Sequence, residues 1–196
     1  MSVVPESVPA GAPAQPSLAD LRAAFRQGKA ELLAHFSSSR PTAPAATRLV
    51  RALARHVDAT LLTLWQLAGM PEHAALIAVG GYGRGELFPH SDVDVLVLLP
   101  PAGGAPTGTA KSAIEGFITA CWDVGLEIGS SVRSVDECIA EADRDVTVQT
   151  ALLESRYLCG SRRVFTTFRH ANTRAMDPKA FLRAKTLEMR QRHQKY

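Results

Sequence analysis

Two aspartates, Asp92 and Asp94, stand two residues apart at the start of an aliphatic run, in the segment SDVDVLVLL. Residues two apart on a β-strand point to the same side, so both carboxylates should project together while Val93 and Val95 face a core. Two neighbouring carboxylates repel each other, and ionising both is costly without a compensating cation. Mg²⁺ prefers oxygen ligands and binds one or two protein carboxylates together with substrate phosphates. The pair therefore indicates a magnesium site, the plain alternative being two aspartates that only cap or turn the chain.

A glycine-rich stretch, GGYGRG, precedes the aspartates at residues 80–85. Gly80 and Gly81 allow backbone N–H groups to approach an anion closely, and Arg84 adds a cation that can bind phosphate. A P-loop is excluded because no GK[ST] follows, and a Rossmann fingerprint fits poorly because the glycine spacing differs. An ordinary tight turn is the alternative, so the glycines suggest a phosphate site only in combination with the aspartates.

The elements that must position these residues follow from hydrophobic periodicity. Apolar residues recur at helical spacing over 17–37, where Ser17 is the expected N-cap, and over 44–68. Arg40-Pro41 breaks the chain between them, so the two helices should form an antiparallel pair. The remaining prediction is a strand at 74–79, a short helical turn, a strand at 93–99, a loop at 101–108, a helix at 109–124, a strand at 126–132 and two or three helices within 135–195. This order predicts an α+β fold, with a small mixed sheet flanked by helices, an N-terminal helical pair and a C-terminal helical segment.

Composition restricts the class of protein. The chain has 196 residues, of which 46% are hydrophobic and 21% charged, as expected for one globular domain with an appendage. No run of about 18 apolar residues exists to span a membrane, and the Pro/Ala-rich start at 1–16 lacks a secretory signal and should be disordered. Cys121, Cys138 and Cys159 lack metal-ligand spacing and are expected to be buried small hydrophobes in a cytoplasmic protein.

The charge is distributed unevenly along the chain. From Gly160 onward there are ten lysine and arginine residues and two acidic ones, within a net charge of +3. Such a basic segment could meet nucleic acid or an acidic partner, or could simply be a solvated helix face. The sequence ends inside a predicted helix without a C-cap, so we expect a fragment of a longer protein.

The spacing of the motifs resembles that of a known superfamily. Val79-Gly80-Gly81, ten residues and then Asp92-Val93-Asp94-Val95 look like the signature of the DNA-polymerase-β-like nucleotidyltransferases. That superfamily has a third carboxylate between hydrophobic residues on a later strand, which Glu127 matches. Glu154, in LLESRYLCG, is a second candidate for this role, its alternative being a helix-surface partner for Arg156 or Arg162.

A longer resemblance covers residues 18–196. The stretches GGYGRGELFPHSDVDVLVL, WDVGLEIGSSVRSVDEC and DVTVQTALLESRYLCGS resemble the N-terminal catalytic region of the bacterial PII uridylyltransferase/uridylyl-removing family. The resemblance implies transfer of UMP from UTP to a tyrosine of the PII signal protein, with release of pyrophosphate. It also implies that glutamine sensing and UMP removal reside in domains outside this chain. One departure is Ser130, where that family has a histidine.

The resemblance also implies roles for residues and a division of the chain. Asp92, Asp94 and Glu127 would be the catalytic residues and Mg²⁺ ligands, and the nucleotide would be bound by Gly80, Gly81, Arg84 and Ser91. Glu86 and His90 would either touch substrate or cap the loop. The expected division is a helical segment at 17–70, a nucleotidyltransferase core at 71–160 and the start of a helical region at 161–196.

Two other functions stay open from the sequence. One is nucleotidyl transfer to another acceptor, such as adenylylation of a protein, antibiotic modification or RNA tailing. The other is a non-catalytic regulatory module with a vestigial site. A membrane partner is not expected, nor is nucleic acid, because few aromatic residues are available for base stacking: Phe165, Phe168, Phe181 and Tyr196.

Overall fold

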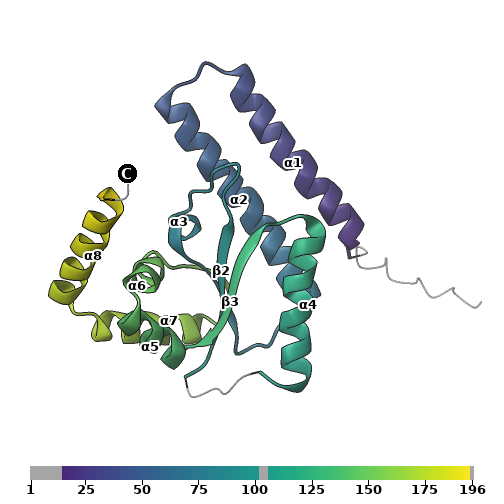
Figure 1. Ribbon diagram of the computed structural model, residues 1–196. Coiled ribbons are helices and arrows are strands. Elements are labelled where there is room, and N and C mark those ends of the chain that lie inside the picture. Colours follow the sequence, from purple (N-terminus) through teal and green to yellow (C-terminus); the bar gives the residue numbers. More distant parts are fainter. Residues whose placement is uncertain (1–14, 102–105, 195–196) are drawn as a thin grey trace, which may run out of the picture.

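The computed structural model describes residues 15–101 and 106–194, in which helices surround one mixed four-stranded sheet (Figure 1). Most of the predicted disordered tail at 1–16 and part of the loop at 101–108 lie outside these ranges. The elements are α1 (Leu18–Ser38), α2 (Ala43–Leu67), β1 (Ala75–Ala78), α3 (Gly80–Gly83), β2 (Val93–Leu99), α4 (Gly108–Val124), β3 (Ile128–Ser134), α5 (Val135–Arg144), α6 (Val146–Leu153), β4 (Arg156–Gly160), α7 (Arg162–Ala175) and α8 (Pro178–His193). The predicted α+β class is confirmed.

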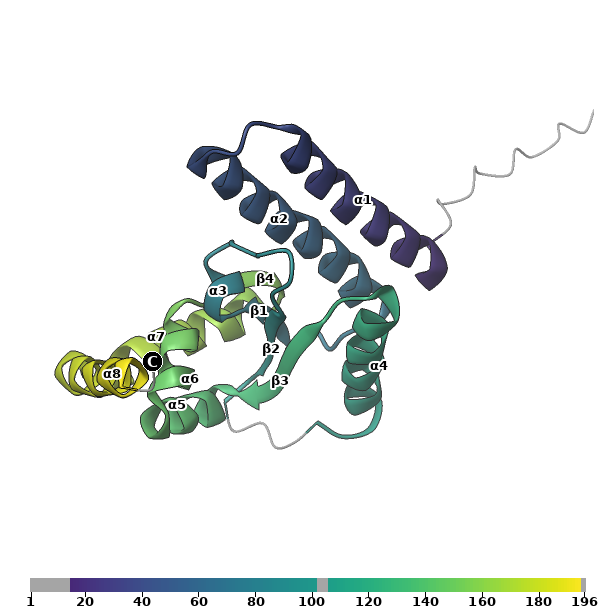
Figure 2. The same cartoon turned by 45° about the horizontal axis from the view of Figure 1, so that its top comes forward.

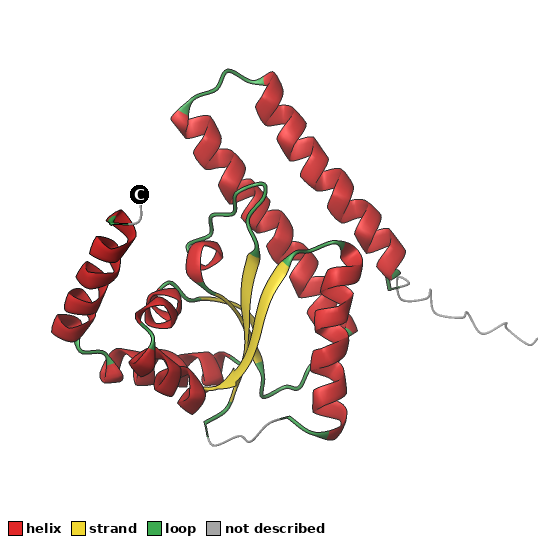
Figure 3. Cartoon of the chain, viewed as in Figure 1, coloured by secondary structure: helices red, strands yellow, loops and turns green. Residues whose placement is uncertain are grey.

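The sheet has the strand order β3-β2-β1-β4, with β2 parallel to β3 and β1 antiparallel to both of its neighbours. Helices cover both faces, α1, α2 and α4 on one side and α5, α6 and α7 on the other (Figures 2 and 3). Val93 and Val95 point into the core between the sheet and helices α1, α2 and α4, as predicted. Leu96 and Leu98 point into the core on the other face, beneath α5, α6 and α7. Because side chains alternate along a strand, Asp92 and Asp94 point to the same face of the sheet as Leu96. Unlike Leu96, both aspartates are exposed.

The N-terminal helices form the predicted pair, side by side in both views (Figures 1 and 2). Ser17 caps α1 in a reciprocal arrangement with Asp20, which confirms the expected helix start. Close packing between the two helices involves Gly28, since a Cβ there would lie 2.4 Å from the His56 ring. The His56 ring also bonds through Nε2 to the Phe25 carbonyl oxygen at 2.9 Å. These contacts attach α1 to α2, whose apolar stripe faces the sheet.

Two predictions about the later part of the chain were wrong. The third strand begins at Ile128 instead of residue 126, so Glu127 precedes it. Residues 156–160 form β4, where only helices were expected, because this segment pairs with the free edge of β1 at Leu76↔Cys159 and Ala78↔Arg156. Pairing with a distant strand decided the conformation of this segment, since its own residues alternate too weakly to signal a strand.

Gly116 offers a test of helix stability on α4. It is exposed in the helix interior, and a Cβ there would meet no atom within 4 Å. We therefore expect Gly116→Ala to raise the free energy of unfolding by about 0.5–1 kcal/mol, because alanine loses less backbone entropy on folding. Urea denaturation measures the change. Gly160→Ala is the opposite control, since Gly160 has φ +85° and its added Cβ would lie 2.3 Å from the Ala74 oxygen.

Candidate active site

The two aspartates lie at the open end of the central strand β2. Asp94 is the second residue of that strand, Asp92 comes just before it, and both are exposed. Partial burial of the Asp94 carboxyl, together with the negative charge of Asp92, raises the pKa of Asp94 above its ordinary value. The raised pKa of Asp94 is thus partly due to the neighbouring carboxylate. Two oxygen-donating carboxylates held together in this way fit a hard divalent cation such as Mg²⁺.

Gly129 makes room for this carboxylate pair. It stands opposite Asp94 in the parallel register of β2 and β3, and a Cβ on Gly129 would lie 2.6 Å from Asp94 Oδ1. That separation is too short for any side chain to be added without moving the carboxylate. The sequence analysis missed this requirement, because only the strand register shows that Gly129 faces Asp94.

The glycine turn lies directly beside the aspartates. It begins where β1 ends, and the Val79 N–H donates to the Asp94 carbonyl oxygen at 3.1 Å, which joins the turn to β2. Gly80 has φ +58°, a conformation that favours glycine, and a Cβ there would stand 3.4 Å from Asp94 Oδ2. The short helical turn expected after the first strand is confirmed as α3.

One open cavity of about 470 Å³ gathers most of the predicted site residues. Its lining includes Gly81, Arg84, Ser91, Asp92 and Asp94. Glu86 and His90, which flank the motif in the sequence, line it as well. The structure thus places the glycine turn, one cation and both aspartates around the same space.

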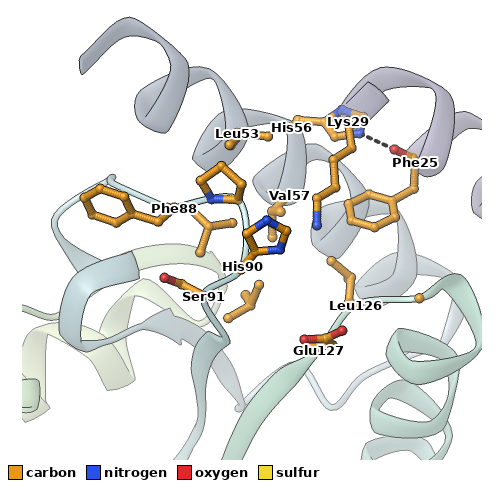
Figure 4. A pocket seen from close by; sticks show the side chains of 14 residues that line it. Phe25, Lys29, Leu53, His56, Val57, Phe88, His90, Ser91, Leu126 and Glu127 are labelled. Carbon is orange, nitrogen blue, oxygen red and sulfur yellow. Dashed lines mark hydrogen bonds between the residues drawn. The ribbon is translucent and has the colours of Figure 1, made fainter. Parts of the chain in front are cut away.

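Glu127 lies apart from this group. Its carbonyl oxygen accepts from the Val93 N–H at 2.8 Å, so its backbone lies beside the start of β2. Its side chain, however, lines an adjoining cavity of about 90 Å³ together with Lys29 and His56 (Figure 4). Within residues 15–101 and 106–194, no three histidine, cysteine, aspartate or glutamate side chains are grouped closely enough to hold a metal. The structure therefore places Asp92 and Asp94 in one cavity and the third expected carboxylate, Glu127, in the adjoining one.

Glu154 binds Arg84 and neither of the arginines that were expected as its partners. Arg84 Nη1 lies 2.7 Å from Glu154 Oε2, and Arg84 Nε lies 3.9 Å from Glu86 Oε2. The Arg84 side chain is 50% exposed, at the rim of the cavity. Glu154 thus holds the cation proposed for phosphate binding.

Neutralising Glu154 should strengthen nucleotide binding. In Glu154→Gln the Arg84 guanidinium loses its competing carboxylate, so we expect the dissociation constant for a nucleoside triphosphate to fall about two- to fivefold. Stability should change little, because exposed ion pairs contribute only about 0–1 kcal/mol. Calorimetric titration measures the affinity, with Glu115→Gln on α4 as the control, since its pair with Lys111 is remote from the cavity. Weaker binding would mean instead that Glu154 orients Arg84 for the ligand.

Three residues at the glycine turn or near it were assigned no role in the site from the sequence. Asp58 of α2 accepts from the Tyr82 hydroxyl of α3 and from both terminal nitrogens of Arg156 on β4. Burial and the Asp58 charge raise the pKa of Tyr82, so its hydroxyl stays protonated as a donor. No local pattern could have identified this network, because its members lie 24 to 98 residues apart.

Comparison with known proteins agrees with this geometry. A family model described as a nucleotidyltransferase domain matches residues 61–138, which include the glycine turn and both aspartates. This part of the chain is therefore similar to a nucleotidyltransferase domain, the class that the glycine turn and the carboxylate pair suggest.

Within that class its relatives have a particular name. The bifunctional uridylyltransferase/uridylyl-removing enzymes of Burkholderia mallei (strain SAVP1) and Burkholderia pseudomallei (strain 668) are each 54% identical to it over 175 residues. The enzyme of that name from B. pseudomallei strain K96243 is 53% identical over the same length. Each alignment covers 89% of this chain and 20% of the relative, so the chain spans about a fifth of the relatives' length. The resemblance drawn from the motifs is confirmed, and the chain is related to these uridylyltransferases.

Proposed function

We propose that the chain transfers UMP from UTP to a tyrosine of the PII signal protein and releases pyrophosphate. The observation that carries this proposal is the pair Asp92 and Asp94 beside the Gly80–Gly81 turn at one open cavity. The uridylyl group is supported by the name of the relatives, and PII as acceptor by the family that the motifs resemble. Because the relatives are about five times longer, we propose that glutamine acts through other domains of a cytoplasmic, full-length enzyme.

The proposed reaction is an in-line attack of the tyrosine oxygen on the α-phosphate of UTP. Asp92 and Asp94 would hold Mg²⁺, which neutralises phosphate charge and lowers the pKa of a bound hydroxyl. The backbone N–H groups of Gly80 and Gly81 and the Ser91 hydroxyl would orient the phosphates. Arg84, at the cavity rim, would offset the negative charge that develops on them.

Glu127 stays our proposed third carboxylate. Its backbone adjoins the start of β2 through the bond from Val93, although its side chain lines the neighbouring cavity. The two cavities share Leu87, Phe88, His90 and Ser91, so the segment before β2 lines both the Glu127 cavity and the cavity of the aspartates. We propose that Glu127 turns toward the pair when substrate binds and accepts the proton of the attacking hydroxyl.

RNA as the acceptor finds little support in the structure. Base stacking needs exposed aromatic rings, and Phe168 is fully buried while Phe165 packs against Tyr157. Two of the four aromatic residues in the basic segment are therefore already packed within the protein.

The structure has no helix, in the ranges it describes, that is long and apolar enough to cross a membrane.

Calorimetric titration with UTP, ATP, CTP and GTP, with and without Mg²⁺, tests the nucleotide assignment. We expect binding that requires Mg²⁺, favours UTP and is lost in Asp92→Asn. A preference for ATP would replace the proposal with an adenylyltransferase. Absence of binding by all four nucleotides would contradict a catalytic role of this cavity in the chain.

A further inference from the structure

A polar network links three elements beside the glycine turn. Arg156 Nη1 donates to Asp58 Oδ2 at 2.9 Å, and Arg156 Nη2 donates to Asp58 Oδ1 at 3.1 Å. The Tyr82 hydroxyl donates to the same Asp58 oxygen, and Arg156 Nη2 also donates to the Tyr82 carbonyl at 3.2 Å. Helix α2, turn α3 and strand β4 are thus joined at one point.

The network binds the side chain of Tyr82, which is part of the turn. In Gly80–Gly83, Tyr82 alone has a side chain, which is 2% exposed and lies under the Arg156 guanidinium at 5.3 Å from the ring centroid. A Cβ on Gly83 would lie 1.9 Å from the carbonyl oxygen of Glu154, the residue that caps the end of α6, so the backbone of the turn is packed directly against that helix end. Gly80, at the start of the turn, lies beside Asp94, and Gly81 and Tyr82 contribute to the lining of the cavity.

The energetics favour a geometric role for this network. The Asp58 and Arg156 side chains are only 22% and 31% exposed, and desolvation of such a pair offsets most of its attraction. Arg156 Nε is buried and has no hydrogen-bond partner within the described ranges, which is an added cost. The network thus contributes little net stability, but it fixes the Tyr82 carbonyl and the Tyr82 ring. Its main effect is therefore on the conformation of the turn.

We propose that Asp58, Tyr82 and Arg156 are positioning residues for nucleotidyl transfer, which hold the Gly80–Gly83 turn in place against Asp94. The proposal rests on the proposed function, because the position of the turn matters only if Gly80 and Gly81 contact the phosphates of a nucleotide. Asp58 lies outside the stretches that carry the family resemblance, and the resemblance assigns no role to Tyr82 or Arg156 within them.

Amide hydrogen exchange together with UTP titration tests this in the full chain. In Asp58→Asn, loss of the charge weakens both the Arg156 bonds and the Tyr82 bond. We expect the amides of Gly83, Arg84 and Gly85, whose hydrogen bonds close the turn, to exchange at least about tenfold faster. The dissociation constant for Mg-UTP should rise about tenfold in Asp58→Asn. In Arg156→Lys both the exchange rates and the dissociation constant should lie between those of Asp58→Asn and the wild type, because lysine keeps the charge and loses the bidentate hydrogen bonding.

Cys121→Ala is the matched control. Cys121 is fully buried in α4, in the same core as Tyr82, and takes no part in the hydrogen bonds of the network, so the variant is expected to lower Tm while all three network side chains are kept. If Asp58→Asn lowers Tm but leaves exchange at residues 83–85 as slow as in Cys121→Ala, the network is merely structural and the proposal is overturned. The exchange measurement needs no nucleotide, so failure of wild-type protein to bind UTP would overturn the proposed function independently of this result.

Discussion

An Asp92→Asn, Asp94→Asn double variant is expected to lose nucleotidyl transfer by at least about a thousandfold while keeping its fold. The two carboxylates interact with each other and line the cavity beside the glycine turn. A bound metal ion contributes several kcal/mol of transition-state stabilisation, and each 1.36 kcal/mol is a factor of about ten in rate. Transfer of radiolabelled UMP to the acceptor measures the loss.

The same variant should be at least as stable as the wild type in metal-free buffer. The pKa of Asp94 is raised in the folded state, so its ionisation opposes folding. That penalty is absent below the unfolded pKa and is complete once the pH exceeds the folded pKa. The gain in Tm should therefore grow as the pH rises through this acidic window and stay constant at neutral pH. Asp123→Asn, on the exposed surface of α4, is the control for losing one charge. Substantial transfer by the double variant would refute the catalytic assignment.

Gly129→Ala should lower kcat/KM for transfer about a hundredfold without unfolding the protein. The added Cβ would stand 2.6 Å from Asp94 Oδ1, and the end of that side chain can move aside. Stability therefore changes little, but the carboxylate leaves its position, and a displacement of about 1 Å at a reacting centre can cost about a hundredfold in rate. Steady-state kinetics and a thermal melt on the same preparation separate the two effects.

Gly116→Ala is the matched control for this substitution, because its Cβ meets no neighbouring atom. It should leave kcat/KM unchanged while raising Tm slightly. If Gly129→Ala transfers UMP at the wild-type rate, the position of the Asp94 carboxylate does not limit the reaction.

The sequence was informative where local pattern and structure agree. Helical periodicity and Ser17 located α1, and the aliphatic run after Asp94 located β2. It failed at β4, because the residues 156–160 are only partly buried and become a strand through pairing with β1. Glu127 was placed within a strand on the strength of its hydrophobic neighbours, and the ladder in fact starts one residue later.

The site could be predicted only as far as contiguous motifs extend. The glycine turn and the aspartates are separated by few residues, so one combined motif contained both, and the structure shows them around the same cavity. The Arg84–Glu154 pair joins residues 70 apart, and the Asp58–Arg156 pair joins residues 98 apart. Contacts over such separations depend on the strand order of the sheet, which no local pattern encodes.

The position of β4 also has a consequence for how the site is acquired during folding. β4 pairs with β1 across roughly eighty residues of intervening chain, and contacts that close long loops form slowly. Helices α1 and α2 and the β1–β2 hairpin can assemble from local contacts while the ribosome is still adding residues. The glycine turn cannot acquire its anchor until Arg156 has been synthesised and β4 has docked on the sheet edge. During synthesis, therefore, strands β1, β2 and β3 are expected to pair before the glycine turn is fixed in place.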